Sequence, residues 1–189
     1  MDNYLSDPIL LIITTALSFL KYILIFRFLF EITMVNFYNP ISQAIVKITS
    51  PILAPLRLFS LNIGRVDLMI ILLILVVISF EIILPYLFQT VSLNLIHVAI
   101  FSFGLFLKTI LNIYFYLIII SAIASWFFAY NNHPLFSLIN ELCEPLYYPV
   151  RNLLPQTPGI DFSPIVLLLL IQITEMIILR PIFELIKYF

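Results

Sequence analysis

The chain has little of what a water-facing surface requires. Of its 189 residues only 10% are Asp, Glu, Lys or Arg, whereas 63% are hydrophobic, and the mean hydropathy is +1.16. Soluble domains carry about 25% charged residues and about half apolar ones. Because so few polar residues cannot cover a surface that faces water, the composition predicts an integral membrane protein in contact with the lipid bilayer.

Scarce glycine, cysteine and histidine limit the chemistry that the chain can perform. None of the three glycines has the spacing of a phosphate-binding loop. The single cysteine, Cys143, excludes an intrachain disulfide and a cysteine-rich metal site. His97 and His133 stand on different segments, which disfavours a shared haem. With a net charge of −1, we therefore expect no enzyme, no cofactor or metal, and no nucleic-acid partner.

Long hydrophobic runs are what the chain has in quantity. A membrane-spanning helix needs about 20 mostly apolar residues. The first run follows acidic rather than basic residues and has no small-residue cleavage site, so we expect a retained helix. The third run contains no proline, which favours one long helix, with a five-span alternative left open. The predicted spans are 8–36, 67–88, 95–130 and 163–186. The loop after the first span is 37–66, and the loop after the third span is 131–162.

The two loops repeat each other at a distance of 94 residues. "PILAPLR" at 51–57 returns as "PLYYPVR" at 145–151, and the same frame continues into the following spans. We therefore expect two tandem repeats, 1–90 and 91–189, each ordered helix, interfacial amphipathic segment, helix. The frame aligns Pro51 with Pro145, Pro55 with Pro149, Arg57 with Arg151, Asp67 with Asp161, and Glu81 with Glu175.

The number of spans sets the direction of the repeats. Two crossings per repeat return the chain to its starting side, so the repeats are parallel and both loops face one compartment. With a split third run the repeats would be inverted, as in many transporters. The loops carry Lys47, Arg57, Arg65 and Arg151, whereas the other side offers only Lys187. The positive-inside rule then predicts cytoplasmic loops and external termini.

Each loop begins with a helix signal. Asn39 before Pro40, and His133 before Pro134, are an N-cap followed by a proline at the first helical position. The apolar residues that follow recur at helical spacing, which predicts short helices in the plane of the membrane interface. We expect Pro51 and Pro145 to end them, because proline clashes with the preceding turn.

Two interpretations of the loop arginines stay open. Arg57 and Arg151 either contact lipid phosphates at headgroup level or belong to a symmetric docking surface or pore mouth. Asp67 and Asp161 start the next helices, where a carboxylate is favourable at the positive end of the helix dipole. Both aspartates are also placed to pair with the arginines.

Ionisable residues within the spans are costly and indicate either structure or function. Lys21 and Glu81 come at a similar depth, about 20 Å from the loop side, and Arg27 and Glu31 share a helix face. One interpretation is a set of ion pairs that join the two repeats. The other is a path for a cation or proton that uses Glu81 and Glu175. Separately, a ridge of small residues predicts packing against another membrane protein or a second copy: Ser121, Ser125 and Ala129.

The segments "FYNPISQAIVKITSPILAPLR" and "ISAIASWFFAYNNHPLFSLINELCEPLYYPVRNLLPQTPGIDFSPIVLLLL" resemble the two copies of the YggT motif. The first copy departs where Ile32 stands for tryptophan and Met69–Ile70 for Ser-Pro. The second copy matches the motif fully and is therefore the better candidate for an interaction surface. Its matching residues are Trp126, Pro134, Pro145, Pro149, Arg151, Gly159, Asp161, Ser163 and Pro164.

The resemblance implies a multi-pass protein of the bacterial inner membrane. Bacterial relatives are linked to osmotic or potassium-related stress and to the cell-division or envelope region, and chloroplast relatives to haem attachment in cytochrome b6 and to nucleoid distribution. We therefore expect a non-catalytic scaffold or assembly factor. The alternatives are a channel or ion-homeostasis component using Glu81 and Glu175, and a haem-handling assembly factor.

Overall fold

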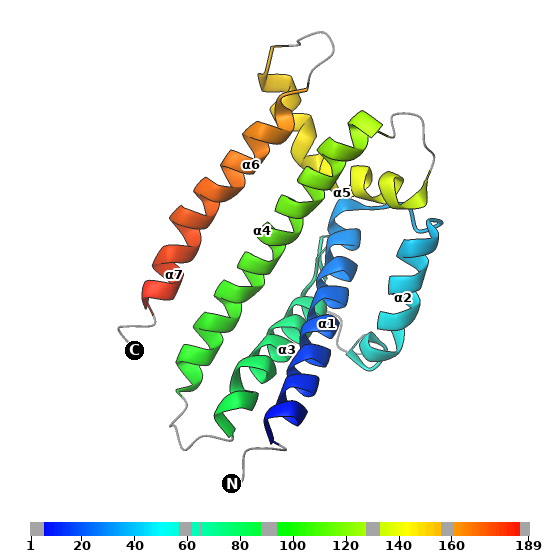
Figure 1. The fold of residues 1–189 in the computed structure, drawn as a ribbon. Coiled ribbons are helices and arrows are strands. Elements are labelled where there is room, and N and C mark those ends of the chain that lie inside the picture. Colours follow the sequence, from blue (N-terminus) through cyan, green and yellow to red (C-terminus); the bar gives the residue numbers. More distant parts are fainter. Residues whose placement is uncertain are drawn as a thin grey trace.

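A computed structural model shows a bundle of long helices, with the helix α5 (Pro134–Leu153) lying across one end of it and the shorter helix α2 (Pro40–Leu53) beside it (Figure 1). It describes residues 6–56, 62–64, 66–87, 94–127, 133–155 and 161–185. Within these ranges, four helical stretches are long and apolar enough to cross a membrane: Asp7–Thr33, Leu68–Tyr86, Leu95–Ser125 and Ser163–Leu185. The predicted class, a helical membrane protein with four spans, is confirmed.

The first repeat contains three helices and a small hairpin. These are α1 (Ser6–Thr33), α2 (Pro40–Leu53), β1 (Asn62–Ile63), β2 (Val66–Asp67) and α3 (Leu68–Leu87). The strands are antiparallel and pair Asn62 with Asp67. Gly64 turns the hairpin with a φ of 64°, a conformation that suits glycine. These two strands of two residues each were not anticipated in an otherwise helical fold.

The elements of the second repeat are all helices among its described residues. It contains α4 (Leu95–Phe127), α5 (Pro134–Leu153), α6 (Ser163–Thr174), the π-helical segment η2 (Glu175–Leu179) and α7 (Arg180–Leu185). The third hydrophobic run forms the single helix α4, so four spans are confirmed over five. The π-helix was not anticipated; it lies inside the last span, which α6, η2 and α7 form together.

The repeats point the same way. In Figure 1, α1 and α4 run toward the end where α5 lies, and α3 and α6 run back. Both loop regions therefore begin at the same end, here called the loop-side end. Helix α3 packs between α1 and α4, and α4 packs between α3 and α6. This is the parallel arrangement expected from two spans per repeat.

The short helices of the two repeats start alike but run differently. Asn39 Oδ1 accepts a hydrogen bond from the Ile41 N–H, and His133 Nδ1 accepts one from the Leu135 N–H, so both predicted N-caps are present. Helix α5 crosses the loop-side end, whereas α2 runs alongside α1 (Figure 1). The prediction of helices in the interface plane therefore describes α5 but not α2, whose small buried Ser42 permits close packing.

The prediction that Pro51 and Pro145 end the short helices is wrong. Helix α2 continues to Leu53, and α5 continues through Pro145 and Pro149. Proline costs about 3 kcal/mol or more inside a helix, because it removes a hydrogen bond and crowds the preceding turn. Burial on both sides of the prolines offsets this cost in α5, which bends along its length instead of ending (Figure 1). The buried residues concerned are Leu138, Ile139, Leu142, Cys143, Tyr147 and Val150.

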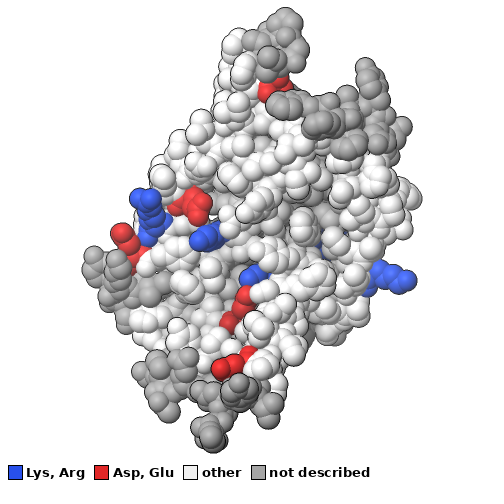
Figure 2. Space-filling model, in the orientation of Figure 1, with Lys and Arg blue, Asp and Glu red and all other residues white. Residues whose placement is uncertain are grey.

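The buried core lies where α1, α3, α4 and α5 meet. Leu24 and Phe30 of α1, Ile74 of α3 and Ile118 of α4 have no exposed surface. Many large apolar side chains are nevertheless exposed, as expected for helices that face lipid. On the face drawn in Figure 2, charged side chains are few and scattered over an uncharged surface.

Candidate functional site at the loop-side end

Two hydrogen bonds fasten the end of α1 to α5 and so join the repeats. The Asn36 N–H donates to Glu141 Oε2 over 2.7 Å, and Asn39 Nδ2 donates to the Pro134 carbonyl over 2.7 Å. Asn39 is buried, and its Oδ1 caps α2. One asparagine side chain therefore sets both the start of α2 and its position against α5.

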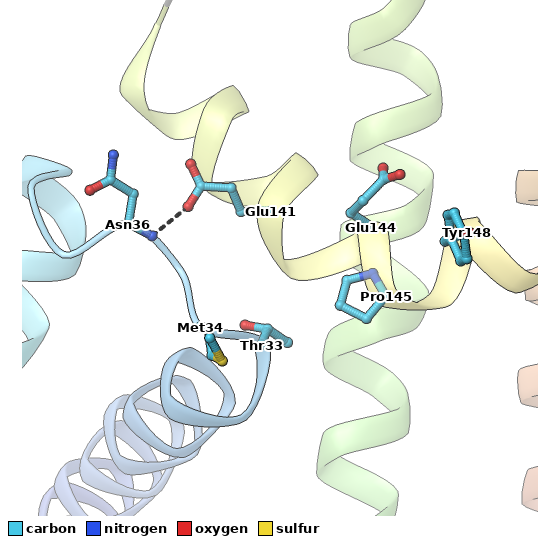
Figure 3. Close-up of a pocket in the computed structure, with 7 residues that line it drawn as sticks. All are labelled: Thr33, Met34, Asn36, Glu141, Glu144, Pro145 and Tyr148. Carbon is cyan, nitrogen blue, oxygen red and sulfur yellow. Dashed lines mark hydrogen bonds between the residues drawn. The ribbon is translucent and has the colours of Figure 1, made fainter. Parts of the chain in front are cut away.

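A cleft of about 550 Å³, here called the loop-side cleft, opens between α5 and the end of α1. Met34 has a φ of 56°, in the left-handed region, and this turn ends α1 and directs the chain toward α5. Figure 3 shows Glu141 and Glu144 projecting from α5 beside the cleft. The cleft thus has an acidic wall. Its lining residues are Thr33, Met34, Asn36, Glu141, Glu144, Pro145 and Tyr148.

Arg151 is the centre of a chain of charges next to this cleft. Its Nη1 lies 3.3 Å from Glu144 Oε2, its Nη2 lies 3.0 Å from Asp161 Oδ2, and its guanidinium lies 4.6 Å from the Tyr147 ring centre. All three charged side chains remain about half exposed. Exposed pairs contribute at most about 1 kcal/mol each. The arrangement therefore fixes the direction of the guanidinium more than it stabilises the fold.

Asp161 and Asp67 each accept a hydrogen bond from the first turn of the helix that follows, at the helix starts that their positions in the sequence predict. Asp161 Oδ1 accepts from the Ser163 N–H over 2.8 Å, and Asp67 Oδ1 accepts from the Met69 N–H over 2.9 Å. Burial raises the pKa of Asp161, but hydrogen bonds from Ser163 and Arg151 outweigh it, so the pKa lies below its ordinary value. Asp161 is therefore ionised at neutral pH and attracts Arg151.

The remaining motif residues surround this cluster in part. Pro51, Pro55 and Pro149 are exposed, and Pro164 lies in the first turn of α6 beside the buried Ser163. Arg57, Gly159 and Ala129 lie outside the described residues, as does the side chain of Trp126. The predicted pairing of an arginine with an aspartate is thus seen in the second repeat.

The chain's one cysteine is free and buried. Cys143 is completely buried, and burial, together with the charge of Glu144, raises its thiol pKa to about 12. A thiol with such a pKa stays protonated near neutral pH and is a poor nucleophile. Among the described residues, no group of three or more His, Cys, Asp or Glu side chains is arranged to hold a metal ion.

The ion pairs within the spans form as expected but do not join the repeats. Lys21 Nζ lies 2.8 Å from Glu81 Oε2, and Ser18 donates a hydrogen bond to the same carboxylate. Arg27 Nη2 lies 2.7 Å from Glu31 Oε1. Both pairs belong to the first repeat, because the face of α3 that carries Glu81 packs against α1. The prediction that they connect the repeats is therefore wrong.

Two further predictions about the spans are corrected. Glu175 makes no ion pair with any residue that the structure describes, in contrast to Glu81. Ser121 is buried and donates to Asn140 Oδ1 of α5 over 3.2 Å. Since Ser121 packs inside the chain, the predicted ridge does not present it to a second molecule; Ser125 is exposed.

A protein-family model described as CCB3/YggT matches the chain twice, over residues 6–88 and 100–182. The chain belongs to the CCB3/YggT family. The two matches begin 94 residues apart, so they reproduce the repeat frame read from the sequence.

The chain is similar over nearly its whole length to curated bacterial relatives. It is 35% identical over 166 residues to the uncharacterized protein YggT of Escherichia coli K12, which covers 87% of this chain and 86% of the relative. It is 32% identical over 178 residues to an uncharacterized protein of Pseudomonas aeruginosa PAO1, covering 93% and 90%. No solved structure matches the chain.

Proposed function

We propose that this YggT-family protein is a non-catalytic scaffold or assembly factor of the bacterial inner membrane, which holds another membrane protein at its loop-side end. The observation that carries the proposal is the surface formed by the loop-side cleft and Arg151. Residues of both repeats build it, cross-repeat hydrogen bonds fix it, and its charges are exposed. A surface whose charges are already oriented favours specific docking, because few side chains have to be ordered when a partner binds and the entropic cost of binding is smaller.

We further propose that the loop-side end faces the cytoplasm. Lys47 and Arg151 lie on exposed positions of α2 and α5, and basic residues in short loops favour the cytoplasmic side. Roles in osmotic or ion stress, or in envelope and cell-division processes, are the settings in which such a scaffold would act.

Site-specific photo-crosslinking in cells tests the docking surface. A photoreactive amino acid at Tyr148, which lines the cleft and is 65% exposed, should capture a defined membrane protein. Tyr116, on α4 and 63% exposed, is the matched control that faces lipid. We expect the Tyr148 adduct to disappear in the Arg151→Gln/Asp161→Asn variant, with the amount of inserted protein unchanged. The same adduct from Tyr116, or an adduct insensitive to the double variant, contradicts the proposal.

An ion-conducting role is the second candidate, since Glu175 lacks an ion-pair partner among the described residues. Against a path shared by both glutamates, Glu81 is held by Lys21 and Ser18, and α4 separates α3 from α6 (Figure 1). Ion flux into proteoliposomes that falls on Glu175→Gln or Glu81→Gln would favour conduction, and purified protein that conducts nothing removes it.

A haem-handling role has less support. His133 caps α5 at the loop-side end, whereas His97 lies near the start of α4, at the other end of the bundle (Figure 1). Two axial ligands of one haem must approach the iron from opposite faces, and one chain does not offer this. Protein purified from haem-fed cells should show no haem absorbance.

A further inference from the structure

The long helices of the two repeats meet through one face of α3 and one face of α4, here called the α3–α4 contact. Ser79 Oγ and Ser102 Oγ lie 2.9 Å apart across it. Leu75, Ser79 and Ile82 share a face of α3 at helical spacing, and each is at least partly buried. On α4 the corresponding face carries Ser102, Leu105 and Thr109; Ser102 and Thr109 are buried and Leu105 is partly buried.

The repeat frame aligns α3 with α6, and the α6 residues that correspond to this face of α3 are exposed. Adding 94 to the three α3 positions gives Leu169, Ile173 and Met176, which are 54%, 50% and 54% exposed. The frame also places the α4 face on α1. Subtracting 94 from the three α4 positions gives a second uncovered face, made of Pro8, Leu11 and Thr15.

The two uncovered faces do not meet within one molecule. Helix α4 lies between α6 and the pair formed by α1 and α3 (Figure 1). Each molecule therefore contains the α3–α4 contact once. It also exposes the residues that correspond to the α3 side of this contact, on α6, and those that correspond to the α4 side, on α1. We propose that a second copy of this chain completes the contact, with α6 of one molecule packing against α1 of the next.

A polar side chain on the open face of α6 supports a protein neighbour there. Gln172 is exposed in the middle of the last span, and its side chain makes no hydrogen bond with the described residues. The equivalent position in α3 is Ile78, which is completely buried. Polar residues in spans are costly in lipid and usually face other protein, where an amide stabilises helix association. Because the contact joins two different faces, repeating it links copies into a ring if the rotation closes and into an open chain if it does not.

Cysteine crosslinking between differently tagged copies tests the proposal. In a Cys143→Ala background, one copy carries Pro8→Cys and the other Ile173→Cys. These positions correspond to Ser102 and Ser79, whose side-chain oxygens lie 2.9 Å apart, so their sulfurs come within reach of a disulfide. Mild oxidation of native membranes should give a covalent species that contains both tags, and neither variant alone should give it.

Two matched variants make the result decisive. Ser79→Cys/Ser102→Cys in one chain should form an intramolecular disulfide and shows that oxidation works. Phe80→Cys lies next to Ser79 in α3 but is 58% exposed to lipid, so it should not crosslink to Ile173→Cys. Crosslinking of Phe80→Cys as strong as that of Pro8→Cys indicates random collision and overturns the proposal. So does the absence of a Pro8–Ile173 product when the intramolecular control forms.

Discussion

The two repeats share a frame of helices but keep their ion pairs at different depths. In the first repeat, Lys21–Glu81 and Arg27–Glu31 lie within the membrane spans. In the second, the pairs of Arg151 with Glu144 and Asp161 lie at the loop-side end. Glu175, at the position of Glu81, has no such partner among the described residues.

The residues at the helix starts are shared by the two repeats, whereas the positions of the ion pairs are not. The N-cap before each short helix and the aspartate before α3 and α6 recur and do the same structural work in both repeats. Charges outside that frame differ. In the first repeat they join helices inside the bilayer, and in the second they are about half exposed at the loop-side end.

The largest expected effect comes from breaking the pair inside the first repeat. Lys21→Met leaves Glu81 with the Ser18 hydrogen bond but no countercharge in an apolar environment. Removing one partner of a buried ion pair costs about 3 kcal/mol or more. We expect a clear fall in the free energy of unfolding, measured by denaturant titration in detergent.

Two variants sharpen that comparison. Lys21→Met/Glu81→Leu should regain most of the lost stability, because no uncompensated charge remains. Glu175→Gln should change the unfolding free energy by no more than about 0.5 kcal/mol, since it breaks no pair seen in the structure. If Glu175→Gln is as damaging as Lys21→Met, the two repeats do not differ in the way described.

A smaller effect is expected from the two aspartates at the starts of α3 and α6. Asp67→Ala and Asp161→Ala each remove an acceptor from a helix start and should cost about 1 kcal/mol. Asn at either position keeps an acceptor oxygen and should restore most of the loss. Thermal unfolding of the four variants distinguishes capping from charge; an Asn variant as unstable as its Ala counterpart shows that charge is the main contribution.

The smallest effect is the pH dependence of the Asp161 contacts. Because the folded state lowers the Asp161 pKa, its contribution is complete above the ordinary value of about 3.9 and is lost as the pH falls through the lowered value. The stability difference between the parent protein and Asp161→Asn should stay constant from neutral pH to about 5 and shrink below about 4. A difference that grows on acidification contradicts the lowered pKa.

Local signals in the sequence predicted the parts of the fold that depend on neighbouring residues. Hydrophobic length located the spans, and Asn39 and His133 marked the starts of α2 and α5. Depth along the helices was enough to pair Lys21 with Glu81, because both lie within adjacent spans of one repeat.

The loop-side cleft escaped prediction because its contacts are remote in sequence. Glu141 accepts a hydrogen bond from the backbone N–H of Asn36, 105 residues earlier, and a backbone group leaves no mark in the sequence. The repeat frame did not help either, since it aligns Glu141 with Lys47. The helix α5 continues past Pro145 because residues on both sides of the proline are buried. A rule that considers only the proline and its neighbours in sequence cannot include this burial.

The side of the membrane reached by each loop region tests the central claim, that the two repeats are parallel. Tyr38→Cys reports on the first repeat and Asn152→Cys on the second, each exposed and each in a Cys143→Ala background. A membrane-impermeant maleimide applied to intact and to opened cells should label both positions from one and the same side. Labelling of the two positions from opposite sides contradicts the parallel arrangement and requires inverted repeats.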